Sequence, residues 1–214
     1  MVDRKNTWRR GELAVLRKLR HPAAIQSFID SFAYNTDKIT RSPRGVIGTG
    51  RAHCFDGAMF AAAAIEYHGG KPWLIDLRAN DEDDDHILAI FSRNGLYGSI
   101  GQSNYTGGRY RDPVFRTIRE LVMSYFCVYF NLAGRKTLRE FSGIFDLRKV
   151  RDIDWRFTTA DLSMLGDRID SIRHYRCIPS KSERELAIAD SRTFKAETLF
   201  LDKKGAFKVK GSLL

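Results

Sequence analysis

The first seventy residues alternate between stretches of helical periodicity and turn-forming stretches. Leucines recur at helical spacing near the start, and apolar residues do so again after Pro22, so the pattern predicts helices over 7–20 and 22–32. Glycine, proline and serine are concentrated over 34–50, which favours a loop. A third helix is predicted over 54–68, where alanines on every side indicate burial and two glycines follow.

Apolar runs of strand length come after the third helix. They predict strands over 73–77, 86–91 and 96–100. An acidic run, 81–85, separates the first two strands, and an Asn-Gly turn joins the last two. Because Asn-Gly favours tight reversals, the last two strands are expected to form an antiparallel hairpin.

The second half of the chain is less regular. Pro113 opens a stretch that predicts a long helix to about residue 131, in which Cys127 is expected to be a small buried side chain. Shorter candidates follow over 138–145, near 158–173 and near 183–194.

Helices followed by consecutive strands indicate an α+β fold, with the alanine-rich helix packed on an antiparallel sheet. We expect an N-terminal helix over 1–21, a core over 22–134, and a mostly helical extension over 135–214 that packs on the core. A chain of 214 residues is long enough for such a core.

Composition narrows the class of protein. Hydrophobic residues make up 43% of the chain and charged residues 29%, which is typical of a globular protein. The three cysteines are widely spaced and form no CxxC pair, which argues against a disulfide framework and a zinc knuckle. A charged N-terminus without an apolar core, and no run long enough for a membrane span, predict a cytoplasmic protein without a membrane partner.

The formal net charge of +10 raises the possibility of nucleic-acid binding. Residues 52–107 nevertheless carry 8 acidic against 3 basic residues, so the basic excess lies on either side of them. The basic residues are scattered and are not interleaved with aromatic residues. A basic solvated surface is therefore the favoured interpretation, and nucleic-acid binding the weaker one.

Cys54 is the first candidate for chemistry, because it opens the alanine-rich helix. Unpaired N–H groups and the helix dipole at such a position favour a thiolate. His86 begins the second predicted strand, which can return beside that helix. An imidazole there could take the thiol proton and pass it to a leaving group.

A third group is needed to orient the imidazole, and it should follow the third strand. Asn104 is the favoured candidate, because an amide oxygen can accept the imidazole N–H. Gln102 could do the same, and Ser103 is a weaker candidate.

Two neighbours of the predicted pair offer alternative roles. His53 is a competing base, but adjacent residues at a helix start point about 100° apart. Asp85 could raise the basicity of His86 if it folds back. The acidic run around it lacks the glycine and terminal glutamate of a calcium loop, so no metal site is predicted.

The order Cys54, helix, strand, His86, strand resembles the transglutaminase-like superfamily of papain-type thiol enzymes. The run from about Ile25 to Phe130 is similar to uncharacterised bacterial proteins grouped with it, and the stretch from Pro22 resembles the helix that often precedes the cysteine. The resemblance implies that Cys54 is the nucleophile and His86 the base. The aspartate usual in this family has no counterpart here, because residues 101–104, at its expected position after the third strand, include no carboxylate.

These observations predict acyl transfer through a Cys54 thioester. His86 would protonate the leaving group, N–H groups at the helix start would stabilise the oxyanion, and water or an amine would resolve the intermediate. The substrate would be a peptide or protein amide, and no cofactor is required. The alternatives are a catalytically silent binding module and, less favoured, a basic nucleic-acid-binding protein.

Overall fold

The computed structural model describes residues 7–37 and 39–214. Residues 1–6, which belong to the N-terminal segment predicted over 1–21, and residue 38 lie outside this description. The α-helices are α1 (Arg10–Lys18), α2 (Pro22–Asp30), α3 (Pro43–Thr49), α4 (Cys54–Tyr67), α5 (Ile118–Met123), α6 (Met164–Asp170) and α7 (Ser191–Glu197). The short 3₁₀ helices are η2 (Thr106–Gly108), η3 (Leu147–Lys149), η4 (Ser180–Glu185) and η5 (Lys203–Gly205). The strands are β1 (Ala33–Tyr34), β2 (Arg51–Ala52), β3 (Trp73–Ala79), β4 (His86–Arg93), β5 (Leu96–Ile100), β6 (Arg111–Phe115), β7 (Leu138–Ser142), β8 (Phe145–Asp146) and β9 (His174–Arg176).

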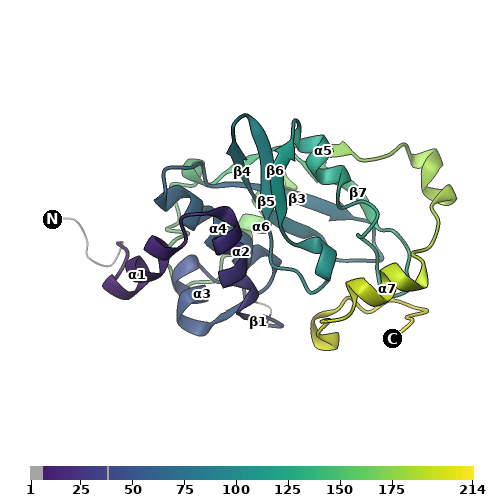
Figure 1. Ribbon diagram of the computed structural model, residues 1–214, viewed down its shortest axis with the longest axis horizontal. Helices are drawn as coiled ribbons and strands as arrows, with labels where there is room; N and C mark the ends of the chain where they lie inside the picture. Colours follow the sequence, from purple (N-terminus) through teal and green to yellow (C-terminus); the bar gives the residue numbers. More distant parts are fainter. Residues whose placement is uncertain (1–6, 38) are drawn as a thin grey trace.

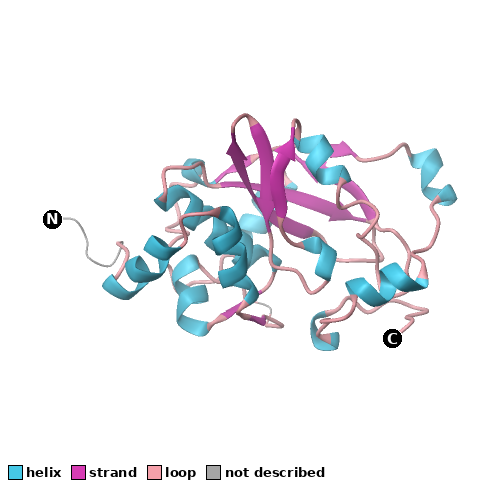
Figure 2. Ribbon diagram, in the orientation of Figure 1, coloured by secondary structure: helices cyan, strands magenta, loops and turns pink. Residues whose placement is uncertain are grey.

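One antiparallel sheet organises the molecule (Figure 2). Within the described residues it has seven strands in the order β6-β5-β4-β3-β7-β9, with β8 also paired to β3. The predicted hairpin is confirmed: Arg93 lies opposite Leu96, and Asn94 and Gly95 both adopt positive φ, as a tight Asn-Gly turn requires. β1 and β2 form a separate parallel pair beside the start of α4.

Alternation along the central strands divides the apolar residues between the two faces of the sheet. Leu74 and Ile87 belong to the cluster that packs with α4, whereas Ile75 and Leu88 belong to the cluster that contains Leu121 of α5. The N-terminal helices thus gather on one side of the sheet and α5 lies on the other (Figure 1). The predicted α+β class and the packing of the alanine-rich helix on an antiparallel sheet are confirmed.

Helix α4 is the buried centre of this arrangement. Every residue from Phe55 to Ile65 is buried, as the alanines predict. Close approach is possible because the side chains are small: a Cβ on Gly57 would lie 2.5 Å from the Cβ of Gln102. The helix start is thereby fixed against the segment that follows β5. No helix in the described part of the chain has the length and apolar character needed to span a bilayer.

The long helix predicted from Pro113 is wrong. Pro113 lies in β6, at the end of the central sheet's strand order, where a missing N–H is tolerated. Helix α5 begins only after Thr117, which with Glu120 forms a capping box, and it ends at Met123. Cys127 follows it and is exposed, not buried.

The region after residue 134 contains strands as well as helices. β7 pairs with β3, and β9 pairs with β7, so the central sheet draws strands from both sides of the expected boundary at residue 134. The extension predicted as mostly helical contains α6 and α7, and it also contributes the short strands β7, β8 and β9, whose strand character the sequence does not indicate. These strands are short and their partners lie far away in the sequence, so local periodicity does not reveal them.

Candidate active site

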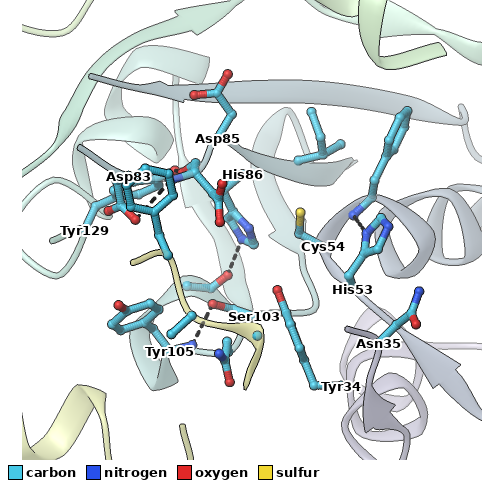
Figure 3. Close-up of a pocket in the computed structure, with 18 of the residues that line it drawn as sticks. Tyr34, Asn35, His53, Cys54, Asp83, Asp85, His86, Ser103, Tyr105 and Tyr129 are labelled. Carbon is cyan, nitrogen blue, oxygen red and sulfur yellow. Dashed lines mark hydrogen bonds between the residues drawn. The ribbon is translucent and has the colours of Figure 1, made fainter. Parts of the chain in front are cut away.

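A cavity of about 650 Å³ opens where the first turn of α4, the start of β4 and the loop after β5 meet. Cys54 is the first residue of α4, His86 is the first residue of β4, and both line the cavity. Figure 3 shows the Cys54 sulfur and the His86 ring directed into the same space. The structure therefore brings together the two residues that the sequence predicts as nucleophile and base.

The thiol of Cys54 is neutral in the free protein. Burial raises its pKa to about 12, and the nearby charges of Asp56 and Asp84 act in the same direction. The backbone N–H groups of Ile87 and Phe55 face the sulfur and lower the pKa, but by less. The expectation that the helix start stabilises a thiolate is therefore wrong here, because loss of water outweighs the N–H groups.

The imidazole of His86 is held in one tautomer. Its Nε2 lies 2.7 Å from the carbonyl oxygen of Gly108, and since a carbonyl only accepts, Nε2 carries the hydrogen. Burial lowers the pKa of His86 to about 4, against the opposing effect of this hydrogen bond. The ring is neutral at neutral pH, and Nδ1 keeps the lone pair that a thiol proton requires.

Two glycines let the loop after β5 reach the ring of His86. A Cβ on Gly108 would lie 2.3 Å from Ser103 Oγ, and a Cβ on Gly101 would lie 2.5 Å from Leu88 Cδ2. A side chain at either position would push the loop away from His86. The carbonyl of Gly108 thus takes the orienting role that the sequence argument gave to a side chain.

Asn104 has other partners than the one predicted. Its Nδ2 donates to the carbonyl of Asp202 at 2.8 Å, and its Oδ1 accepts from the N–H of Asp202 at 2.8 Å. Both hydrogen bonds tie the loop after β5 to the C-terminal segment. The structure does not bring the Asn104 amide to His86.

Gln102 and Ser103 occupy different surroundings, and only Ser103 lines the cavity. Gln102 is buried where its Cβ faces Gly57 of α4. Ser103 lines the cavity and its Oγ accepts from the N–H of Tyr105 at 3.0 Å. Because Ser103 Oγ also lies against Gly108, it stands beside the contact that orients His86.

The side chains of His53 and Asp85 accept hydrogen bonds from backbone N–H groups and do not contact the His86 ring. His53 is the N-cap of α4: its Nδ1 accepts from the N–H of Phe55 at 3.1 Å, and its Nε2 lies 3.5 Å from Asp56 Oδ1. Asp85 Oδ1 accepts from the N–H of Ala79 at 2.7 Å, which fixes the turn before His86. Neither side chain acts on the imidazole directly.

Tyr34 is a cavity residue that the sequence pattern does not predict. This residue lies in β1, inside a stretch predicted as loop, and its ring lines the cavity with the hydroxyl directed toward Cys54 (Figure 3). Burial raises the pKa of Tyr34, and the nearby Cys54 is the next cause. A single tyrosine in a turn-rich segment carries no sequence signal of such a role.

Asp56 was not predicted from the sequence either, although it stabilises the cavity wall formed by β1 and the start of α4. It is fully buried in the first turn of α4, where Oδ1 accepts from the N–H of Arg41 at 2.7 Å and Oδ2 from Asn35 Nδ2 at 3.1 Å. These bonds attach the segment after β1 to the helix start. An acidic residue in a first helical turn was a usable signal.

One group of side chains in the described chain has the spacing of metal ligands. Ligand atoms of Asp76, Asp170 and His174 lie within 4.8 Å of one another, and the two aspartates line the cavity. Arg78 supplies positive charge there, with Nη2 3.3 Å from Asp170 Oδ1 and Nε 3.9 Å from Asp76 Oδ2. The charges of this group are thus partly balanced by the protein itself.

Comparison with known proteins gives one informative similarity. No family model matches the chain. Over 84 residues the chain is 30% identical to tubulinyl-Tyr carboxypeptidase 1 of Mus musculus, a match that covers 38% of this chain and 22% of that protein. The chain thus spans less than a quarter of the length of the curated relative, and shares a limited region with a carboxypeptidase.

Proposed function

We propose that this protein is a thiol-dependent peptide or amide hydrolase in which Cys54 is the nucleophile and His86 the acid and base. The observation that carries the proposal is the shared cavity, with the Cys54 thiol and a His86 ring whose Nε2–H donates to Gly108. That hydrogen bond leaves Nδ1 as the only ring nitrogen able to accept a proton.

In the first step, Nδ1 of His86 accepts the thiol proton while Cys54 Sγ forms a bond to the carbonyl carbon of the substrate. The tetrahedral intermediate collapses as the C–N bond breaks, and His86 returns the proton to the leaving amine. Water then attacks the thioester, again with His86 as base, and releases the acid and the thiol. The thiol proton thus leaves on the amine, a proton from water restores the thiol, and one water molecule is consumed in each turnover.

The oxyanion requires donors beside the sulfur. The backbone N–H of Cys54 at the start of α4 is one candidate, and the hydroxyl of Tyr34 is the second. The Tyr34 hydroxyl forms no hydrogen bond with another residue in the described chain, so it can donate to substrate. Together they would form a two-donor oxyanion site.

Before substrate binds, the Cys54 thiol and the His86 imidazole are both neutral, and this determines the order of proton transfer. A thiol with a raised pKa and an imidazole with a lowered pKa do not form an ion pair before substrate arrives. His86 therefore acts as a general base during attack, and Gly108 stabilises the imidazolium as it forms.

Similarity to a carboxypeptidase favours hydrolysis over transamidation as the second step. It also favours a peptide or protein substrate. The shared region is short, so the substrate of that relative is not assigned to this chain.

Hydrolysis of a fluorogenic peptide-amide library by the purified chain tests the proposal. We expect turnover that falls by at least about 10³-fold in Cys54→Ala and in His86→Ala, because either change removes an essential step. Cys127→Ala, at an exposed cysteine outside the cavity, is the matched control and should retain activity. Equal turnover in Cys54→Ala would contradict the proposal.

A silent binding module is the second candidate, and the raised pKa of Cys54 is the observation that favours it. Such a module would bind peptides in the cavity without cutting them. Peptide binding together with turnover no greater than that of Cys54→Ala would select this candidate.

A further inference from the structure

The cavity beside Cys54 carries a charge opposite in sign to that of the whole chain. The chain has a formal net charge of +10. Among the described residues, the cavity wall holds aspartates at six positions and one lysine: Asp37, Asp76, Asp83, Asp84, Asp85, Asp170 and Lys204. Such a wall attracts cations and repels anions where the substrate must lie.

Three of these aspartates have basic partners within the fold. Asp37 pairs with Arg41, Asp170 with Arg78 at 3.3 Å, and Asp76 with His174 at 3.2 Å. The other three, Asp83 to Asp85, form no ion pair with any residue that the structure describes. The unbalanced negative charge is therefore concentrated in the turn that immediately precedes His86.

Within this turn, the contacts of two carboxylates are local. Asp83 Oδ2 accepts from Thr137 Oγ1 at 2.6 Å, and Asp85 Oδ1 accepts from a backbone N–H of β3. The Asp84 carboxylate accepts no hydrogen bond within the described chain. Its charge is felt at Cys54, at Tyr34 and at Tyr105, so Asp84 lies within electrostatic reach of the reacting atoms.

A buried oxygen without a donor independently indicates a cationic ligand. Asp76 is 0% exposed and lines the cavity; Oδ2 faces His174 Nε2, whereas Oδ1 has no hydrogen-bond partner. Burial keeps a proton on this carboxyl in the free protein, because no donor reaches Oδ1 to stabilise the charge. An ammonium or guanidinium group carries only donors, so it would pair with the oxygen once the carboxyl releases that proton.

Aromatic rings complete the surroundings. Tyr34, Tyr105 and Tyr129 all line the same cavity, and the hydroxyl of Tyr129 donates to the carbonyl oxygen of Asp84 at 2.7 Å. The negative face of a tyrosine ring attracts a cation, and carboxylates beside such rings strengthen the attraction.

We propose that the cavity selects peptides with a lysine or arginine side chain next to the scissile bond, bound by Asp84 and the neighbouring aspartates. This inference rests on the proposed thiol hydrolase for its catalytic meaning. It adds a link between binding and chemistry, because a cation beside Asp84 would offset part of the negative field that keeps Cys54 protonated.

Binding is measured with the Cys54→Ala protein, so that no peptide is cut. Peptides acetyl-Ala-Ala-X-Ala-Ala-amide, with X as lysine, arginine, norleucine or glutamate, are titrated by calorimetry. We expect the lysine and arginine peptides to bind about tenfold more tightly than the norleucine peptide, and the glutamate peptide to bind most weakly. The preference should shrink as salt rises. Equal affinity for lysine and norleucine peptides would overturn the inference.

A matched pair of variants locates the effect. Asp84→Asn should reduce the preference for lysine over norleucine several-fold, because it removes the unpaired charge near Cys54. Asp81→Asn changes an exposed aspartate of the same acidic run that does not line the cavity, and should leave the preference intact. Equal effects of the two variants would mean that general surface charge causes the preference, which contradicts the proposal.

The same peptides given to the unmutated protein separate the two proposals. Preferential binding without cleavage of any peptide contradicts the thiol hydrolase and keeps the cation site. Cleavage of lysine and norleucine peptides with equal kcat/KM contradicts the cation site and keeps the hydrolase.

Discussion

Tyr34 and Cys54 share one wall of the cavity although they come from different elements, β1 and α4. If Cys54 attacks as we propose, a phenol directed at it can donate to the substrate oxygen that gains charge in the transition state, whereas it makes no such bond in the ground state. The role of Tyr34 is therefore separable from substrate binding.

Tyr34→Phe should lower kcat by about 10²-fold and leave KM nearly unchanged, since it removes one oxyanion donor and keeps the ring. Steady-state kinetics on any cleaved peptide measures this. Tyr175→Phe, at a tyrosine that is 42% exposed and outside the cavity wall, provides the control. A rise in KM with unchanged kcat would instead assign Tyr34 to substrate binding.

Asp76 affects stability as well as the cavity. Burial raises its pKa to about 8, so the folded protein keeps a proton that the unfolded chain loses at its ordinary pKa of 3.8. The unfolded state binds fewer protons across this interval, and the contribution of Asp76 to stability is lost as pH rises toward 8.

Asp76→Asn should accordingly raise the Tm by a few degrees at about pH 8 and leave it unchanged at about pH 4, because asparagine has no proton to lose. Thermal unfolding followed by circular dichroism at the two pH values measures this. An equal change at both values would show that packing, not ionisation, governs Asp76.

At the scale of elements, the loop between β5 and β6 decides how His86 is oriented. Its residue Asn104 binds the C-terminal segment, and its residue Gly108 binds the imidazole. Substitutions at these two positions should therefore affect kcat to very different extents, although both positions lie in one loop.

Asn104→Ala should reduce kcat less than tenfold and should increase hydrogen exchange in the segment around Asp202, since it removes two hydrogen bonds to that backbone. Gly108→Ala should reduce kcat far more, because its Cβ would collide with Ser103 and displace the carbonyl from His86. A larger loss in Asn104→Ala than in Gly108→Ala would return the orienting role to the amide.

The elements that the sequence predicted well are those whose partners are close along the chain. The hairpin of β4 and β5 follows from apolar runs around Asn94-Gly95, and the burial of α4 follows from its alanines. The segment of β7 was singled out as a candidate element over 138–145 but not as a strand, because its partner β3 lies far away in the sequence. Cys54 and His86 could be singled out as candidates because thiols and imidazoles carry distinctive chemistry, whereas the carbonyl of Gly108 is a group that every residue possesses.

At the scale of the whole molecule, charge is segregated: a basic chain encloses an acidic cavity. Cationic peptides would be repelled by the surface at long range and attracted only near the opening. Salt screens the long-range repulsion by the basic surface more than the short-range attraction inside the cavity. The association rate constant and the affinity should therefore respond differently to ionic strength.

Affinity for the lysine peptide should rise between about pH 5 and pH 8. Burial raises the pKa of Asp83 to about 6 and that of Asp76 to about 8, so both carboxyl groups gain their negative charge across this range. Calorimetry in buffers of different ionisation enthalpy would detect the accompanying release of protons. The norleucine peptide serves as the control, and a parallel rise in its affinity would contradict the electrostatic cause.

The raised pKa that keeps the partly buried Cys54 protonated also slows its oxidation. Peroxides react with thiolates, so a thiol whose pKa is raised to about 12 is oxidised slowly while no substrate is bound. Cys127 is exposed and would meet an oxidant first. A nucleophile guarded in this way would survive oxidising conditions that inactivate enzymes with a preformed thiolate, and it would become vulnerable only while a substrate occupies the cavity.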